Sequence, residues 1–488
     1  MNNPYPFFRL VFVLGVLLFP LWLGAQSTIS QSVRAFALDP ELAGAAISID
    51  VVDVATGQRV AAHQPEMACI PASTQKLLTT AAAMDILGPD HRFETKLFIT
   101  GDVVDGELRG DLYIVGGGDP SLGSPFLKGV PGLEAILERW RSAVQRAGIT
   151  RINGRVIGDG SYWNTDATPG DWPYSDIGNY YGAGAYGLSI HENLYFLDFL
   201  QRSRVGSQPP IQQTRPQVPG LHLINELRSG PRGSGDQAYV YGSAYNYQNY
   251  VRGTIPVGSK RFTIKGAIPD PPLFTAQAFC RKLEAVGIDV ALPAESHRTL
   301  GGGRYLEGRE IDVYESPELS VLVDRTNLRS LNLYAEALLR EVNKSRGLED
   351  HELGSGKVLK DWLAGQGLNP GPINVEDGSG LGTRNFFPAE FMTAFLRTQV
   401  DNDRWRASIP LAGRTGSMRG FLKGTAAEGR LSAKSGSLNS ARAYAGYARR
   451  KDGRELAFAI MVNNYTIEGK SLRNKMMVLM RELCSGRL

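Results

Sequence analysis

The chain has 488 residues, with 53 lysines and arginines against 49 aspartates and glutamates, and 42% of its residues are hydrophobic. This composition excludes a disordered polyelectrolyte and a small disulfide-stapled module, and the length indicates two or three domains. The net charge of +4, without a basic block that interleaves with aromatic residues, argues against a nucleic-acid partner.

The N-terminal segment, from Met1 to Ala25, has the pattern of a secretory signal peptide. Arg9 precedes an apolar run from Leu10 to Ala25, which Pro20 interrupts. A membrane-spanning helix needs about 20 apolar residues, so this shorter run disfavours an uncleaved anchor. We therefore expect cleavage near Ala25, export to the periplasm, and a mature chain without a transmembrane segment.

The elements that follow begin with a β-hairpin and a helix. Residues 46–54 and 59–63 are strand-like and flank the turn dipeptide Thr56–Gly57. A helix is predicted over residues 72–87, which are rich in alanine and leucine and precede Gly88–Pro89.

The middle of the chain, residues 93–313, has short strand-like segments and frequent glycine, which predicts a separate β-rich region. Helices are expected within it at 132–148 and 274–288, and a loop at 203–219. After it, helical spacing runs from Ser316 to Lys344 and again over 358–367. The chain then forms a hairpin, with strands at 441–450 and 454–464 around the turn Asp452–Gly453.

The main chemical signal is the tetrapeptide Ser73-Thr74-Gln75-Lys76 at the start of the first predicted helix. Residues three apart share a helix face, so the Lys76 amine can reach the Ser73 hydroxyl. A serine becomes a good nucleophile when a neighbouring base takes its proton, and a lysine serves as that base only when it is uncharged. Burial beside another cation favours the uncharged form.

Two further motifs follow in order along the chain. Ser330-Leu331-Asn332 supplies a hydroxyl and an amide, and Lys434-Ser435-Gly436 precedes the C-terminal hairpin. S-x-x-K, S-D-N and K-T-G together mark penicillin-binding proteins and class A β-lactamases. Here Leu331 replaces the aspartate and Ser435 the threonine, which keeps the functional atoms. We prefer Lys434 to the similar Arg414-Thr415-Gly416, because a hairpin edge that can accept an extended peptide follows it.

With these motifs the chain resembles the D-alanyl-D-alanine carboxypeptidase/endopeptidase family of low-molecular-mass penicillin-binding proteins, grouped with penicillin-binding protein 4. The segments DLYIVGGGDPSL, DGSGL at 377–381 and AKSGSL carry the resemblance over nearly the whole mature chain. It implies an α/β (α+β) fold of the serine β-lactamase/transpeptidase type, an antiparallel sheet flanked by helices. The catalytic domain would comprise residues 26–94 and 316–488. Residues 95–315 would form an inserted β-rich region, with a nested domain near 200–255.

The resemblance also implies acyl transfer on peptidoglycan stem peptides, with β-lactams as inhibitors and no metal or other cofactor. Ser73 would attack the D-Ala-D-Ala carbonyl with Lys76 as the base. Ser330 would pass a proton to the departing amine, and Asn332 would orient the substrate amide.

The remaining roles fall on the lysine motif and its surroundings. Lys434 and Ser435 would bind the terminal carboxylate, and Gly436 would let the strand approach the ligand closely. The backbone N–H groups of Ser73 and Ser437 would form the oxyanion hole.

The β-rich insert carries one candidate specificity residue. Asp159 would face the amino end of a meso-diaminopimelate side chain, with a plain turn residue as the alternative. The aromatic residues Tyr162, Trp163 and Trp172 could line the same groove, although packing is the favoured role for each.

Several alternatives stay open. A β-lactamase or esterase on the same fold is one, although the long β-rich insert between Lys76 and Ser330 favours the peptidase. A non-catalytic peptidoglycan-binding protein is another. The G-x-G-x-x-G match at 182–187 lacks the preceding hydrophobic strand of a dinucleotide site. The three cysteines, Cys69, Cys280 and Cys484, predict no zinc site and leave one optional disulfide open.

Overall fold

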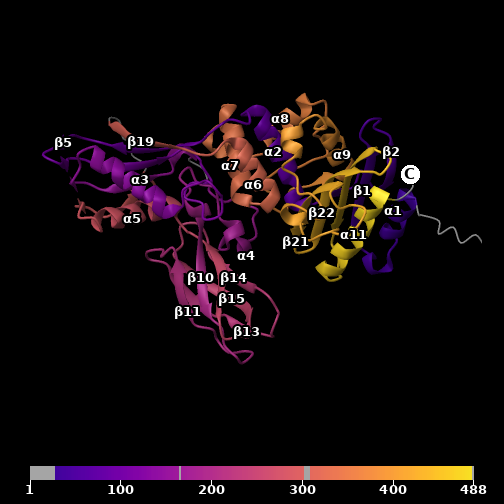
Figure 1. Cartoon of the computed structure of the whole chain (residues 1–488), viewed down its shortest axis with the longest axis horizontal. Coiled ribbons are helices and arrows are strands. Elements are labelled where there is room, and N and C mark those ends of the chain that lie inside the picture. The colour runs from indigo at the N-terminus through magenta and orange to yellow at the C-terminus, as the bar shows by residue number, and fades with distance from the viewer. Residues whose placement is uncertain (1–27, 164–165, 302–307, 486–488) are drawn as a thin grey trace, which may run out of the picture.

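A five-stranded antiparallel sheet joins the two ends of the chain (Figure 1). The structure is a computed structural model that describes residues 28–163, 166–301 and 308–485; the predicted signal peptide lies outside these residues. The strand order is β2-β1-β23-β22-β21, and β1 pairs with β23 along its whole length. The bounds are β1 (Ala46–Asp53), β2 (Arg59–His63), β21 (Leu431–Leu438), β22 (Ala441–Arg449) and β23 (Glu455–Asn463).

Both faces of this sheet are covered by helices. Because side chains alternate along a strand, each strand contributes residues to both helical layers. In β23, Leu456, Phe458, Ile460 and Val462 pack with α1 (Ile29–Ala37) and α11 (Gly469–Ser485). The residues between them, including Ala457 and Ala459, face the other helical layer, where small side chains let a helix pack closely. A strand buried on both faces is apolar throughout, which explains the unbroken hydrophobic run of the C-terminal hairpin.

The second helical layer carries the first two chemical motifs. Its centre is α2, which packs against α6 and α7, so segments that are distant in sequence lie together. The bounds are α2 (Lys76–Ile86), α6 (Leu319–Arg329), α7 (Asn332–Ser345), α8 (Lys357–Gly365), α9 (Ala389–Thr398) and α10 (Asp403–Arg406). A small ladder of β3 (Ala68–Cys69) and β20 (Phe387–Pro388) lies beside them.

The strands between Glu94 and Glu315 form sheets of their own. One group comprises β4 (Glu94–Ile99), β5 (Val103–Val104), β6 (Glu107–Leu108), β7 (Leu112–Gly116), β8 (Arg151–Ile152), β9 (Val156–Asp159), β17 (Asp289–Val290), β18 (Glu295–Ser296) and β19 (Arg309–Glu315), with α3 (Leu133–Arg146) and α5 (Pro271–Glu284).

A second group of strands projects from the body of the molecule in Figure 1. It comprises β10 (Leu194–Leu200), β11 (Ile211–Arg215), β12 (His222–Asn225), β13 (Arg228–Gly230), β14 (Gln237–Tyr241), β15 (Gln248–Pro256) and β16 (Arg261–Ala267), and the short helix α4 (Tyr174–Ile177) precedes it. The division of the chain into catalytic, inserted and nested domains stays a prediction, which this separation of the sheets supports.

Two local expectations were wrong. The predicted loop at 203–219 contains strand β11, whose side chains are mostly polar and half-exposed. It pairs with β10 at the edge of a sheet, where backbone hydrogen bonding needs no apolar pattern. The helical spacing over 316–344 is interrupted at Ser330, which adopts a left-handed φ of 59° between α6 and α7.

The predicted fold class, an antiparallel sheet flanked by helices with a β-rich insertion, is confirmed. No helix among the described residues has the length and apolar character needed to cross a membrane. The optional disulfide is not formed, since Cys69, Cys280 and Cys484 are buried free thiols.

Candidate active site

Ser73 lies in a short 3-10 turn, η2 (Ala72–Gln75), directly before α2. The turn begins at Ala72 with a positive φ of 46°, and the Thr74 hydroxyl donates to the Pro71 carbonyl at 2.8 Å. Positive φ is unfavourable for alanine, so the surrounding packing must hold this conformation. The turn directs Ser73 into a groove of about 1220 Å³.

Lys76 is the first residue of α2 and is completely buried. Its Nζ donates to Ser73 Oγ at 2.9 Å, to Asn332 Oδ1 at 2.6 Å and to the Ser379 carbonyl at 2.6 Å. An uncharged amine has two N–H groups and one lone pair. If the amide and the carbonyl accept the two N–H groups, the lone pair is left for the Ser73 hydroxyl.

The electrostatic environment favours the uncharged form of this amine. Burial lowers the pKa of Lys76 from 10.5 to about 7, and the carboxylates of Asp377 and Glu336 oppose part of that fall. Near neutral pH a substantial fraction of Lys76 is therefore able to accept a proton.

The break between α6 and α7 places the second motif. Ser330 is the left-handed residue of the break, and Asn332 begins α7. The Asn332 side chain accepts from Lys76 and donates through Nδ2 to the Tyr181 carbonyl at 2.7 Å. These contacts use one oxygen lone pair and one N–H group of the amide, and Asn332 lines the groove, so its role in orienting the substrate amide stays a prediction.

Lys434 lies on β21, fully buried, and its Nζ donates to Ser330 Oγ at 2.7 Å and to the Ser435 carbonyl at 2.8 Å. Burial, and then the charge of Lys76, lowers the pKa of Lys434 well below its usual value. The site therefore contains two serine–lysine pairs, Ser73 with Lys76 and Ser330 with Lys434.

Ser435, which is predicted to bind the substrate carboxylate, has a hydrogen-bond partner outside the three motifs. Ser435 Oγ donates to Ser417 Oγ at 3.1 Å. Ser417 directly follows the rejected triplet Arg414-Thr415-Gly416. Two residues further along β21, Ser437 Oγ accepts from the Arg442 guanidinium at 3.2 Å.

Gly436 lies where β21 passes the turn that carries Ser73. A Cβ atom on Gly436 would lie 2.5 Å from the Pro71 carbonyl oxygen and 3.0 Å from the Ser73 nitrogen. Only a glycine allows this approach of the edge strand to the nucleophile.

We expect Gly436→Ala to slow acylation of Ser73 by about tenfold or more, because the added methyl group would displace the Ser73 backbone. The measurement is the rate of covalent labelling by a fluorescent penicillin. Gly365→Ala is the matched control, since a Cβ there meets no atom within 4 Å. Equal rates in the two variants would contradict the prediction.

The groove has walls from both parts of the molecule. Ser73, Ser330, Asn332 and Ser437 line it from the sheet and helix side, and Asp176, Tyr181, Asp236 and Tyr239 line it from the inserted region. β21 is the edge strand of the central sheet, so an extended peptide could lie along it.

Asp159 is not among the described residues that line this groove. It ends β9, is buried, and accepts from the Ser161 backbone N–H at 2.8 Å. That position favours the turn role over contact with substrate. The inserted carboxylates that do line the groove are Asp176, whose pKa is raised by burial, and Asp236.

The three aromatic candidates have packing and hydrogen-bonding roles. The Tyr162 hydroxyl donates to Glu341 at 3.1 Å, and Trp163 is buried in the core. Trp172 is also buried, and its indole N–H donates to Asp377 at 2.8 Å. Among the described residues no group of three or more histidine, cysteine and acidic side chains is placed to hold a metal ion.

A family model described as the D-Ala-D-Ala carboxypeptidase 3 (S13) family matches residues 29–483. The chain belongs to this family. It is 27% identical over 463 residues to a D-alanyl-D-alanine carboxypeptidase of Actinomadura sp., covering 91% of this chain and 82% of that protein. It is 24% identical over 462 residues to the D-alanyl-D-alanine carboxypeptidase DacB of Haemophilus influenzae, covering 90% of each.

The fold agrees with this assignment. The crystal structure of penicillin binding protein 4 from Haemophilus influenzae matches with a TM-score of 0.79 at 22% identity, covering 93% of this chain and 98% of that one. The predicted resemblance is confirmed, and the D-Ala-D-Ala carboxypeptidase family member described here is a serine-type hydrolase.

Proposed function

We propose that this protein cleaves the D-Ala-D-Ala bond of peptidoglycan stem peptides through an acyl-enzyme on Ser73. The observation that carries the proposal is the fully buried Lys76 amine, 2.9 Å from the Ser73 hydroxyl, beneath a groove bounded by an edge strand. A β-lactam would acylate the same serine and inhibit the enzyme.

In the first half-reaction, Ser73 Oγ forms a bond to the peptide carbonyl carbon while its proton passes to Lys76 Nζ. The backbone N–H groups of Ser73 and Ser437 stabilise the oxyanion, a role supported by the close approach of β21 at Gly436. The carbon–nitrogen bond then breaks, and the terminal D-alanine leaves as an amine after receiving a proton.

Ser330 passes a proton to that amine from its hydroxyl, which lies on the groove and accepts from Lys434. Ser330 then receives the proton that Lys76 took from Ser73, so Lys76 is uncharged again before water attacks. Lys434 and Ser435, with Ser417 beside them, are the groups we assign to the substrate carboxylate end. In the second half-reaction water attacks the acyl-enzyme, Lys76 again serves as the base, and Ser73 is restored.

The function is tested by incubating the protein with a muropeptide that ends in D-Ala-D-Ala and measuring released D-alanine. Parallel digestion of purified sacculi distinguishes the two peptidase modes. Loss of cross-linked dimers indicates endopeptidase action, and shortening of pentapeptides alone indicates carboxypeptidase action. Absence of both D-alanine release and penicillin labelling would overturn the proposal.

A β-lactamase is the second candidate, and rapid turnover of nitrocefin in place of a stable penicilloyl adduct would favour it. We also propose that the enzyme acts in the periplasm, where its substrate lies. Fractionation of cells that produce the full chain, with N-terminal sequencing of the product, tests export and cleavage near Ala25.

The rate of acylation should rise with pH through about 7, because only the uncharged Lys76 accepts the Ser73 proton. Below that pH the rate should fall about tenfold per unit, in proportion to the uncharged fraction. Rates of fluorescent-penicillin labelling between about pH 5.5 and 8.5 measure this limb. A flat profile in protein that stays folded throughout would contradict the assignment of Lys76 as the base.

A further inference from the structure

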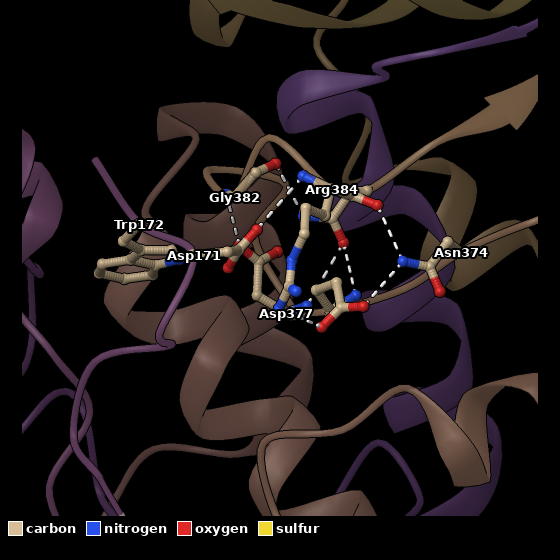
Figure 2. A network of polar contacts seen from close by, with 8 residues as sticks. Asp171, Trp172, Asn374, Asp377, Gly382 and Arg384 are labelled. Carbon is tan, nitrogen blue, oxygen red and sulfur yellow. Dashed lines mark hydrogen bonds and ion pairs between the residues drawn. The ribbon is translucent and has the colours of Figure 1, made fainter.

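Asp377 lies at the start of the segment DGSGL and is completely buried. Its Oδ1 accepts from the backbone N–H groups of Ser379 at 3.1 Å and Gly380 at 2.6 Å, and more distantly from Gln75 Nε2 at 3.4 Å. Its Oδ2 accepts from the Gly382 N–H at 2.7 Å and from the Trp172 indole at 2.8 Å (Figure 2). One carboxylate thus organises a whole turn of backbone.

This turn points its carbonyl groups at α2. The Ser379 carbonyl accepts from Lys76 Nζ at 2.6 Å, and the Gly378 carbonyl accepts from the Thr79 hydroxyl at 2.7 Å. Gly380 has a positive φ of 75°, and a Cβ there would lie 2.0 Å from the Ala72 carbonyl oxygen. The turn is therefore packed directly against the segment that carries Ser73.

The inserted region holds this turn at a second point. Asp171 Oδ2 accepts from the Arg384 backbone N–H at 3.3 Å, immediately beside the contact that Trp172 makes with Asp377 (Figure 2). A Cβ on Gly382 would lie 2.1 Å from Asp171 Oδ2, so the two segments are in close contact.

The two acceptors of Lys76 other than Ser73 therefore both depend on residues inserted between the first two motifs. The Asn332 amide is held by the Tyr181 carbonyl, and the Ser379 carbonyl is held through Asp377 by the Trp172 indole. These contacts fix where the two N–H groups of an uncharged Lys76 point, and hence where its lone pair points.

We propose that Asp377 is a positioning residue that directs the lone pair of Lys76 at Ser73, and that Trp172 completes its hydrogen-bond shell from the inserted region. This inference rests on the proposed function. It adds that the inserted region is needed for acylation of Ser73 itself. Removing the hydrogen bond between Trp172 and Asp377 should slow acylation, even though neither of these residues touches the substrate.

The charge of Asp377 gives the proposal a second observable. Asp377 and Glu336 are the carboxylates whose attraction raises the pKa of Lys76, and the charge of Lys76 in turn lowers the pKa of Lys434 on β21. The charge of Arg340 acts on Glu336. Removing the Asp377 charge should lower the pKa of Lys76 and move the acidic limb of the rate profile to lower pH.

The experiment compares Asp377→Asn with the wild-type chain in penicillin labelling across pH. An amide in place of the carboxylate presents an N–H₂ group to backbone donors in either orientation, so the turn loses part of its support. We expect the plateau rate to fall about 10- to 100-fold, as misplacement of a catalytic group does, and the acidic limb to move to lower pH. A residue that supports the turn without electrostatic contact with Lys76 would not move the limb.

Trp172→Phe is the second variant, because it removes the indole N–H while retaining an aromatic ring and the Asp377 charge. We expect a smaller fall in plateau rate, of about 3- to 10-fold, without a shift of the limb to lower pH. The matched controls concern the indole–carboxylate hydrogen bond of 2.6 Å between α8 and α2, away from Lys76: Trp362→Phe removes its donor, and Asp85→Asn removes the charge of its acceptor. Both controls should keep the wild-type rate and profile.

Thermal unfolding shows whether each variant is folded. If Asp377→Asn does not fold, the comparison of Trp172→Phe with its control tests the proposal. If the wild type is active and the folded variants match their controls in rate and pH profile, this inference is overturned and the proposed function is not. A wild-type chain that neither labels with penicillin nor releases D-alanine would overturn the proposed function, and the inference with it.

Discussion

Replacing Ser73 by alanine is expected to abolish release of D-alanine and formation of the penicilloyl adduct. The variant lacks the oxygen that forms the acyl bond, and Ser330, the other groove hydroxyl of the motif set, is paired with Lys434. We expect a fall in rate of about 10⁴-fold or more, comparable with loss of the nucleophile in other serine hydrolases. Intact-protein mass spectrometry after incubation with penicillin measures the adduct directly.

The control for Ser73→Ala is Ser345→Ala at the far end of α7, where the hydroxyl bonds only to the Val342 carbonyl. That variant should retain wild-type acylation. Because Ser73 contributes one hydrogen bond to Lys76 and lies on a groove, its removal should change the unfolding temperature little. Covalent labelling of Ser73→Ala at the wild-type rate would show that another residue is the nucleophile.

Replacing Lys76 by methionine is expected to give the second largest loss, about 10²- to 10⁴-fold in the acylation rate. Methionine is similar in length and apolar, so it can occupy the buried space without supplying a base. The Asn332 oxygen and the Ser379 carbonyl lose their donor, at a cost of about 1–3 kcal/mol for each buried unsatisfied group. Burying an amine also has a cost, which partly offsets this destabilisation.

The pH profile distinguishes loss of the base from general damage to the site. In Lys76→Met the rise in rate through about pH 7 should disappear, whereas a distorted but functional site would keep it. Lys344→Met is the matched control, since that Nζ donates to the Tyr162 carbonyl at 2.9 Å and is not among the described residues that line the groove. A residual limb near pH 7 in Lys76→Met would assign that titration to another group.

The pairing of two lysines with two serines makes the site asymmetric. Two carboxylates near Lys76 oppose the fall in its pKa. For Lys434, in contrast, the charge of Lys76 lowers the pKa further. Placing two cations side by side in a buried site is costly. The arrangement therefore favours a state in which at most one of the two lysines is charged. Lys76 must be uncharged to accept the Ser73 proton, and this state allows it.

Much of the site could be predicted from local pattern. The spacing of Ser73 and Lys76 on one helical turn depends on residues within a few positions of the motif. The C-terminal hairpin was predictable because its turn dipeptide and apolar strands are contiguous. Local geometry of this kind is set mainly by backbone sterics and neighbouring side chains.

Other features could not be predicted from such patterns. The left-handed conformation of Ser330 interrupts a spacing that is otherwise helical, and only packing of α6 and α7 against α2 decides where the break falls. The resemblance made Asp159 a candidate specificity residue, yet it ends the buried strand β9 and is not among the described residues that line the groove.

The sequence by itself determined the reacting pair, the order of the three motifs and the hairpins near the two chain ends, because each follows from periodicity or short spacing. The tertiary structure alone decided that Ser330 pairs with Lys434, and that Ser379 and Asn332 hold the Lys76 amine. These contacts join residues that are far apart along the chain. Their formation depends on how buried polar groups find partners as the whole core packs, which no local pattern encodes.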